Sequence, residues 1–95
     1  MELRHLRYFI AVAEELHFAR AAERLHIEQS PLSRAIKDLE SDLGVRVFER
    51  TTRSTRLTWA GQVFLDEARR VLSMLEQAKA SAKSAATGYR GTLRI

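Results

Sequence analysis

One short stretch of the sequence gathers side chains suited to hydrogen-bonding the edges of nucleic-acid bases. These residues are Gln29, Ser30, Pro31, Ser33 and Arg34. Advancing about 100° per residue places the polar ones on one helix face together with Lys37, whereas the apolar residues between them share the opposite face. Glutamine and serine are short enough to contact base edges, arginine reaches a guanine or a phosphate, and proline suits a thymine methyl group. The stretch therefore predicts a helix inserted amino-terminal end first into a DNA major groove, with Lys37 near the backbone.

Arginines gather again directly after this helix, in residues 46–57. Arg46, Arg50, Arg53 and Arg56 oppose a single glutamate there, which gives a local net charge of +3. Such a cluster alone is as typical of a solvated surface as of phosphate binding. Its position beside a groove-binding helix favours phosphate contacts for Arg50 and Arg56. It also favours insertion of Arg53 into an adjacent minor groove.

The sequence holds little that suits catalysis or metal binding. The three histidines have no partner histidine three or four residues away, and there is no cysteine to complete a zinc site. Ser30 and Ser33 lack the Gly-x-Ser-x-Gly turn of hydrolases, and the four glycines form no phosphate-cradling loop. We expect no enzyme activity, no catalytic or metal-binding residue and no cofactor on this segment. His17, at the start of a short helix, could approach a phosphate, although a plain surface role is more frequent.

Composition sets the broad class. With 95 residues, 45% hydrophobic content, one proline and a net charge of +4, the chain suits one small helix-rich domain, and its charge alone does not establish nucleic-acid binding. The longest apolar run spans about six residues, far short of the ~20 that cross a bilayer. The amino terminus has no signal-peptide layout. We therefore expect a cytoplasmic protein without membrane association.

Three helices and a hairpin are predicted to position these side chains. Apolar residues recur at helical spacing over 2–16 and again over 18–25. After a short break at 26–28, Ser30 is expected to cap the third helix, about 30–43, with Pro31 in its first turn. Gly44 should end that helix in a left-handed conformation. The order of a short helix, a tight break and a polar-faced helix is typical of a helix-turn-helix.

The hairpin and a long helix complete the prediction. Residues 45–50 and 54–58 alternate like two short strands, which predicts a wing. Thr58 then suits the cap of a helix over 59–87, roughly 43 Å long at ~1.5 Å per residue. The indole of Trp59 is expected to pack between the wing and this helix. The fold class is therefore mainly α, a winged helix-turn-helix followed by a long linker helix.

Apolar residues of the long helix follow a heptad spacing of 4, 3, 4, 3, 4, 3. The seam consists of Phe64, Ala68, Val71, Leu75, Ala78, Ala82 and Ala85. A helix this long extends beyond so small a domain, so the seam predicts pairing with a second copy. Packing on its own domain alone would explain only the first two turns. We thus expect a DNA-binding domain at 1–58, a dimerisation helix at 59–87, and a hinge at 88–95 that leads into the first strand of a missing domain.

The order and spacing of these motifs resemble the amino-terminal domain of LysR-type transcriptional regulators. The likeness runs from LRHLRYFIAVAEELHFARAAERLHIEQSPLSRAIKDLESDLGVRVFER through TRLTWAG to the closing GTLRI. It implies a homo-oligomer, often a tetramer, that binds an interrupted palindrome in double-stranded DNA and responds to a small-molecule inducer. It maps base contacts onto the Gln29–Arg34 stretch and the wing contact onto Arg53. Glu28 and Thr52 depart from the commonest family pattern. The opening MELRHLRYF is similar to regulators of aromatic-compound catabolism.

Two alternatives remain open from the sequence. A helical protein-interaction module would explain the heptads equally well, but it leaves the Gln29–Arg34 stretch and the arginine-bearing wing without a role. A winged helix of another regulator family would keep the DNA binding. The heptad arm and the GTLRI ending argue against that second alternative.

Overall fold

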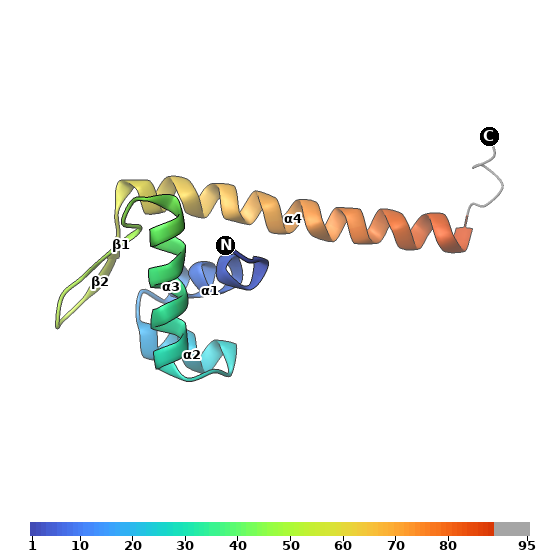
Figure 1. Cartoon of the computed structure of the whole chain (residues 1–95). Helices are drawn as coiled ribbons and strands as arrows, with labels where there is room; N and C mark the ends of the chain where they lie inside the picture. The colour runs from blue at the N-terminus through green and yellow to red at the C-terminus, as the bar shows by residue number, and fades with distance from the viewer. Residues whose placement is uncertain (89–95) are drawn as a thin grey trace.

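The computed structural model describes residues 1–88, which form a small helical domain and a long helix that projects from it (Figure 1). The helices are α1 (Leu3–Glu15), α2 (Phe18–Leu25), α3 (Gln29–Leu43) and α4 (Trp59–Gly88), and the strands are β1 (Phe48–Arg50) and β2 (Thr55–Leu57). The predicted winged helix-turn-helix with a long final helix is therefore confirmed. Residues 89–95 of the expected hinge, and the strand expected to follow it, lie outside the described residues.

The two strands form an antiparallel hairpin, here called the wing (residues 48–57), which extends to one side of α3 (Figure 1). Phe48 pairs with Leu57, and Arg50 pairs with Thr55. Each strand has three residues, so the predicted strands at 45–50 and 54–58 were too long. Val47 lies just outside the ladder. Its carbonyl accepts a hydrogen bond from the Thr58 N–H at 3.0 Å, and its N–H is bonded to a carboxylate of α3.

The start of α3 differs from the prediction by one residue. The helix begins at Gln29, and Glu28 is its N-cap residue, with an extended backbone and no side-chain cap. The prediction that Ser30 caps α3 was therefore wrong, since Ser30 and Pro31 lie inside the first turn. Proline is tolerated there because the N–H it lacks would have no partner within the helix. Gly44 ends α3 with a φ of 76°, as predicted.

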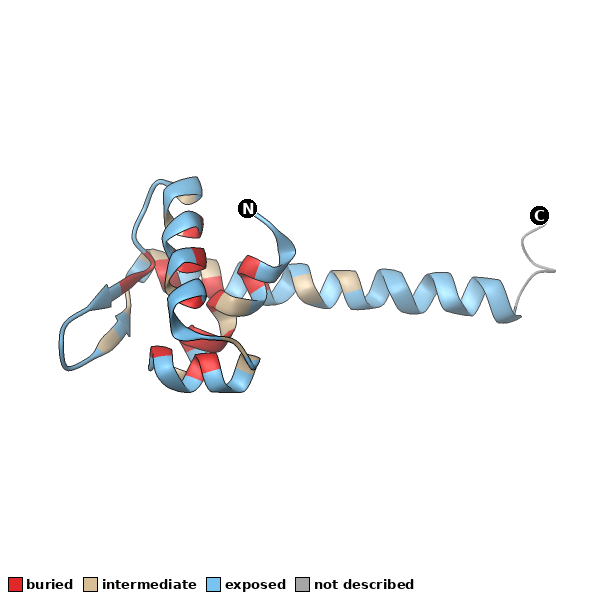
Figure 2. Ribbon diagram, turned by 60° about the horizontal axis from the view of Figure 1, so that its bottom comes forward, coloured by how far each residue is buried: buried red, intermediate tan, exposed pale blue. Residues whose placement is uncertain are grey.

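The core is organised around the ring of Phe9 on α1, which is fully buried. Its centroid lies 5.4 Å from that of Phe48 on β1 and 5.1 Å from that of Phe64 on α4. Phe18 of α2 contacts the Phe48 ring from another side, at 6.0 Å. Burying a phenylalanine contributes about 1.5–3 kcal/mol. These rings therefore join α1, α2, the wing and α4 in one core (Figure 2).

Thr58 and Gly61 fix the junction between the wing and α4. The Thr58 hydroxyl accepts a hydrogen bond from the Gly61 N–H at 2.9 Å and donates one to the Arg46 carbonyl at 2.8 Å. The predicted cap of α4 is thus confirmed. Gly61 lies so close to Val47 that a Cβ there would be 2.1 Å from the Val47 carbonyl oxygen. A side chain larger than hydrogen therefore does not fit at this crossing.

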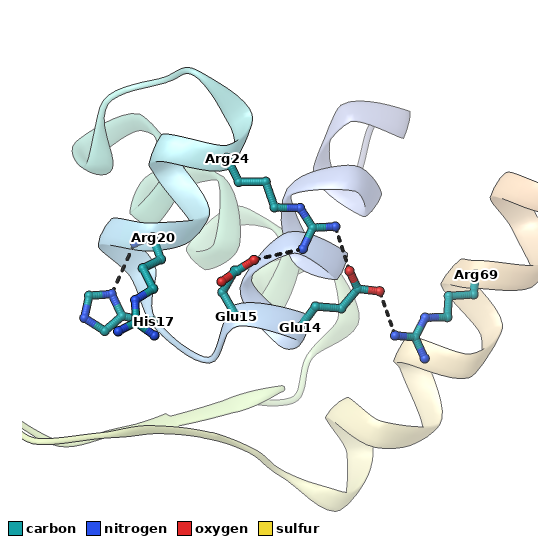
Figure 3. A network of polar contacts seen from close by, with 6 residues as sticks. All are labelled: Glu14, Glu15, His17, Arg20, Arg24 and Arg69. Atoms are coloured by element: carbon teal, nitrogen blue, oxygen red, sulfur yellow. Dashed lines mark hydrogen bonds and ion pairs between the residues drawn. The ribbon is translucent and has the colours of Figure 1, made fainter.

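An ion-pair network ties α4 to α1 and α2 (Figure 3). The Glu14 carboxylate contacts Arg69 of α4 at 2.8 Å and Arg24 of α2 at 2.6 Å, and Arg24 also reaches Glu15 at 3.2 Å. The guanidinium of Arg69, followed by that of Arg24, lowers the pKa of Glu14 below its ordinary value. Glu14 therefore stays ionised at neutral pH and holds both arginines, although the exposure of these groups weakens each pair.

The early residues of α4 pack differently from what the sequence predicted. Trp59 is 79% exposed, so the prediction that its indole packs between the wing and α4 was wrong. Gly61 and Leu65 face the core, and Trp59 lies about 200° from Gly61 around the helix. Ala68, placed in the heptad seam, is only 1% exposed and belongs to the core of its own domain. Within residues 1–88, no helix is both long and apolar enough to cross a membrane.

We predict that Gly61→Ala destabilises the protein because the added methyl group collides with the backbone of Val47. Overpacking of this kind costs about 1–3 kcal/mol. Gly88→Ala is the matched control, since nothing lies within 4 Å of the Cβ it would add. Urea unfolding followed by circular dichroism at one fixed protein concentration measures the difference. Equal unfolding free energies for the two variants would contradict the close approach at Gly61.

Candidate nucleic-acid interface

The polar face of α3 is presented to solvent. Gln29, Ser30, Pro31 and Arg34 are exposed and Ser33 is half-buried. The opposite face, with Leu32, Ile36 and Leu39, is buried in the core. The structure thus brings all five predicted base-contacting residues together on the amino-terminal half of one helix.

Two cations on this face remain available to a ligand. Arg34 and Lys37 are exposed, and within residues 1–88 neither forms an ion pair. The first turn of α3 also has no side-chain cap, so its N–H groups add partial positive charge at the helix start. This face therefore combines neutral hydrogen-bonding groups, which suit base edges, with positive charge that has no partner within residues 1–88, which suits phosphates.

A tight turn sets the direction of α3. α2 ends at His26, whose φ of 59° is left-handed, and the Ile27 N–H bonds to the Ala22 carbonyl at 3.0 Å. Ile27 is half-buried and packs against the core, which anchors the turn. The predicted break at 26–28 is confirmed, and it directs the start of α3 outward.

Each wing arginine has a different environment. The Arg50 guanidinium lies 3.7 Å from the centroid of the Phe18 ring, which attaches the wing to the start of α2 through a cation–π contact. Arg56 is 3.4 Å from Glu49 across the hairpin. Arg53 is exposed in the turn. Its backbone N–H donates to the Thr51 hydroxyl at 3.1 Å, and its side chain forms no ion pair within residues 1–88. Arg53 is therefore the predicted wing contact whose side chain is most free to reach DNA.

The turn of the wing accommodates Thr52 without strain. The Thr51 N–H bonds to the Ser54 carbonyl at 2.8 Å, and the Thr51 hydroxyl also accepts the Ser54 N–H at 3.0 Å. Among the described residues, the non-glycine positions with positive φ are Leu16 and His26. Thr52 thus adopts an ordinary backbone conformation, and no glycine is needed at the tip.

His17 serves as the N-cap of α2. Its Nδ1 atom accepts a hydrogen bond from the Arg20 N–H at 3.2 Å (Figure 3). The side chain is exposed and directly precedes Phe18, over which Arg50 lies. The predicted approach of His17 to a phosphate stays a prediction, now with a structural role beside it.

Glu40 is the residue of this site that the sequence analysis missed. Its Oε2 atom accepts hydrogen bonds from the N–H groups of Val47 at 2.8 Å and Phe48 at 3.3 Å, and it lies 3.4 Å from Arg46 Nε. The side chain is only 14% exposed. One carboxylate of α3 therefore holds the first strand of the wing. The sequence signal was weak, namely an acidic residue at the border between the polar and apolar faces.

A cleft lies between α1 and α3 beside Arg34, with Arg4 and Tyr8 of α1 on its other wall. Its volume is about 220 Å³. Within the described part of the chain, no group of three or more histidine, cysteine, aspartate or glutamate side chains is placed to hold a metal ion.

Residues 3–62 match the family described as "Bacterial regulatory helix-turn-helix protein, lysR family". The chain is 56% identical over its full 95 residues to YnfL of Escherichia coli (strain K12), an uncharacterized HTH-type transcriptional regulator, and covers 32% of that protein. It thus spans about a third of the length of this relative.

Two solved structures share the fold. One is a complex of the DNA-binding domain of BenM with catB site 1 DNA, with a TM-score of 0.88 and 46% identity, over 94% of this chain and 99% of that one. The other is a complex of the CbnR DNA-binding domain with DNA, with a TM-score of 0.88 and 48% identity, over 90% of this chain and 99% of that one.

We predict that Glu40→Ala lowers the unfolding free energy by about 1–3 kcal/mol, because two buried backbone N–H groups lose their acceptor. Glu49→Ala is the control, since the exposed pair of Glu49 with Arg56 contributes little. Hydrogen exchange should show faster exchange at Val47 and Phe48 in the first variant only. Unchanged protection of these two amides would mean that Glu40 does not hold the wing.

Proposed function

The chain belongs to the LysR family of bacterial regulatory helix-turn-helix proteins, and we propose that it binds an interrupted palindrome in double-stranded DNA as a homodimer. The observation that carries this proposal is the amino-terminal half of α3, which presents polar side chains and two unpaired cations around an uncapped helix start. A helix of this kind fits the major groove, which is about 12 Å wide.

Roles follow from the position of each side chain. The five residues on the α3 face, Gln29, Ser30, Pro31, Ser33 and Arg34, contact base edges. Lys37 contacts the backbone from the next turn of α3. Arg53, in the turn of the wing, enters the neighbouring minor groove. The residues nearest the phosphates are Arg50 and Arg56 of the wing and His17 at the start of α2. Arg50 acts from a fixed position, because its guanidinium already lies over Phe18.

Dimerisation through α4 accounts for apolar side chains that the domain itself leaves exposed. Val71 and Met74 are 48% and 66% exposed. Further along the seam, Leu75 is half-buried, and Ala78 and Ala82 are exposed. Phe64 and Ala68 are already packed against their own core, so the paired surface begins after them. Two copies related by a two-fold axis would present their α3 helices about one DNA turn apart, ~10 bp.

A second part of the proposal concerns the whole protein, of which this chain is the DNA-binding part. We propose that it is a cytoplasmic transcriptional regulator, not an enzyme, assembled as a homo-oligomer such as a tetramer. A small-molecule inducer would bind outside residues 1–88. Control of the catabolism of aromatic compounds stays a prediction from the opening residues. The rival interaction module is disfavoured, because structures at 46% and 48% identity are complexes with DNA.

Selection of duplexes from a random pool tests the proposal and defines the DNA site.

Two variants then test the roles of single arginines. Arg34→Ala should weaken binding to the selected duplex by about 1–3 kcal/mol and relax the base preference at one position. Arg53→Ala should lower the affinity for all sequences and make its salt dependence shallower. Fluorescence anisotropy across a salt series measures both effects. Absence of an enriched palindrome would reject the proposed function, and an equal loss on every sequence would make Arg34 a phosphate contact.

We predict that Val71→Glu shifts the protein from dimer to monomer, because it places a charge on the exposed apolar surface of α4 without disturbing the core. Ser73→Glu adds the same charge to a different face of α4 and should leave the dimer intact. Sedimentation velocity over a concentration series provides the measurement. A Val71→Glu variant that sediments like the Ser73→Glu variant would exclude this face from the interface.

A further inference from the structure

The cleft between α1 and α3 is lined mainly by hydrogen-bond donors, and the roles proposed above use only Pro31 and Arg34 of its lining. Arg4, His5 and Tyr8 line it from α1, and Arg34 lines it from α3. Its volume of about 220 Å³ leaves room for a phosphate group. The cleft therefore adjoins the base-contacting face of α3 through Arg34, which belongs to both.

The two arginines supply the positive charge. Arg34 forms no ion pair within residues 1–88. Arg4 lies 3.1 Å from Glu2, but both side chains are more than half exposed. Exposed pairs of this kind contribute little to stability. Arg4 can thus exchange Glu2 for a stronger anionic partner at little cost.

His5 adds a buried donor. The residue is only 8% exposed, and its Nδ1 atom accepts a hydrogen bond from the Glu2 N–H at 3.1 Å. Since Nδ1 accepts, the proton of the neutral ring lies on Nε2. Nε2 has no hydrogen-bond partner among the described residues. The ring, which belongs to a residue that lines the cleft, therefore has one N–H donor without a partner among the described residues.

Asp38 is the one acidic side chain in the lining. Together with Arg4 and Arg34 it leaves a net charge of +1, from two positive charges and one negative charge. This balance fits a single phosphate rather than a string of phosphates. The Tyr8 hydroxyl is a further group able to donate to an anion.

The position of the cleft points to the source of that phosphate. The amino-terminal end of α1 and the wing lie on opposite sides of α3 in both views (Figures 1 and 2). A major groove is bordered by two backbones, so a helix inserted in it has phosphates on both sides. The wing and the start of α2 face one of these backbones. The other backbone would then pass the α1 side of α3.

We propose that the cleft between α1 and α3 binds a DNA backbone phosphate on the strand opposite the wing, held by Arg4 with His5 and Tyr8, beside the base-contacting Arg34. The proposal rests on the proposed function, because the phosphate belongs to the duplex bound by α3. It makes α1 part of the DNA interface. It also fixes Arg34 from the side, which limits the bases that its guanidinium reaches.

Arg4→Gln, with Arg7→Gln as the matched control, tests this assignment. Arg7 is also exposed on α1, forms no ion pair within residues 1–88 and does not line the cleft. On the selected duplex, Arg4→Gln should reduce the slope of log affinity against log salt by about one. The slope should fall by the same amount on a scrambled duplex, because a phosphate contact carries no sequence information. Arg7→Gln should keep the wild-type slope.

Duplexes with one neutral methylphosphonate linkage, moved along the strand opposite the wing, locate the contact. At one position the methylphosphonate should weaken binding by the wild type and leave the affinity of the Arg4→Gln variant unchanged. Equal slopes for the two variants, or an equal methylphosphonate effect in wild type and Arg4→Gln, would overturn the proposal. Shifts of Arg4 and His5 resonances on adding inorganic phosphate alone, with unchanged DNA affinity in Arg4→Gln, would overturn it in favour of a free-anion site. A wild type that binds no duplex would instead refute the proposed function.

Discussion

The packing of Phe9 against Phe48 and Phe64 is the contact on which the rest of the structure depends. It is the point where α1, the first strand of the wing and the long helix meet. Phe18 extends the cluster to α2, and the guanidinium of Arg50 lies over the Phe18 ring. The same rings that stabilise the core therefore also orient the wing and the start of α2. A domain with so few layers has no second core that could position them independently.

Polar contacts fix the orientations of the wing and of α4, which apolar packing alone does not determine. Apolar contacts are not directional, whereas a hydrogen bond needs a distance and an angle. Glu40 of α3 orients the wing in this way by accepting hydrogen bonds from the N–H groups of Val47 and Phe48. The hydrogen bond from the Gly61 N–H to the Thr58 hydroxyl orients the first turn of α4. The ion pair of Glu14 with Arg69 connects the middle of that helix to α1. α3, the wing and α4 are thus connected through a few short contacts.

Particular residues show where prediction from sequence ended. The helices, the break at 26–28 and the cap at Thr58 were predicted, because periodicity and turn chemistry are local properties. Trp59 was placed wrongly, since its environment depends on which side of α4 meets the domain. Ala68 fits the heptad spacing, yet the structure assigns it to its own core. Heptad spacing identifies an apolar stripe but does not say which partner covers it.

The sequence by itself determined the elements, their order and the polar face of α3, because these follow from the spacing of side chains along single helices. Only the tertiary structure decided which surfaces meet. It brought Glu40 to the wing and left Trp59 exposed. It also opened the cleft in which Arg4 of α1 faces Arg34 of α3. Contacts between residues thirty positions apart depend on the crossing of whole helices, which no local pattern encodes.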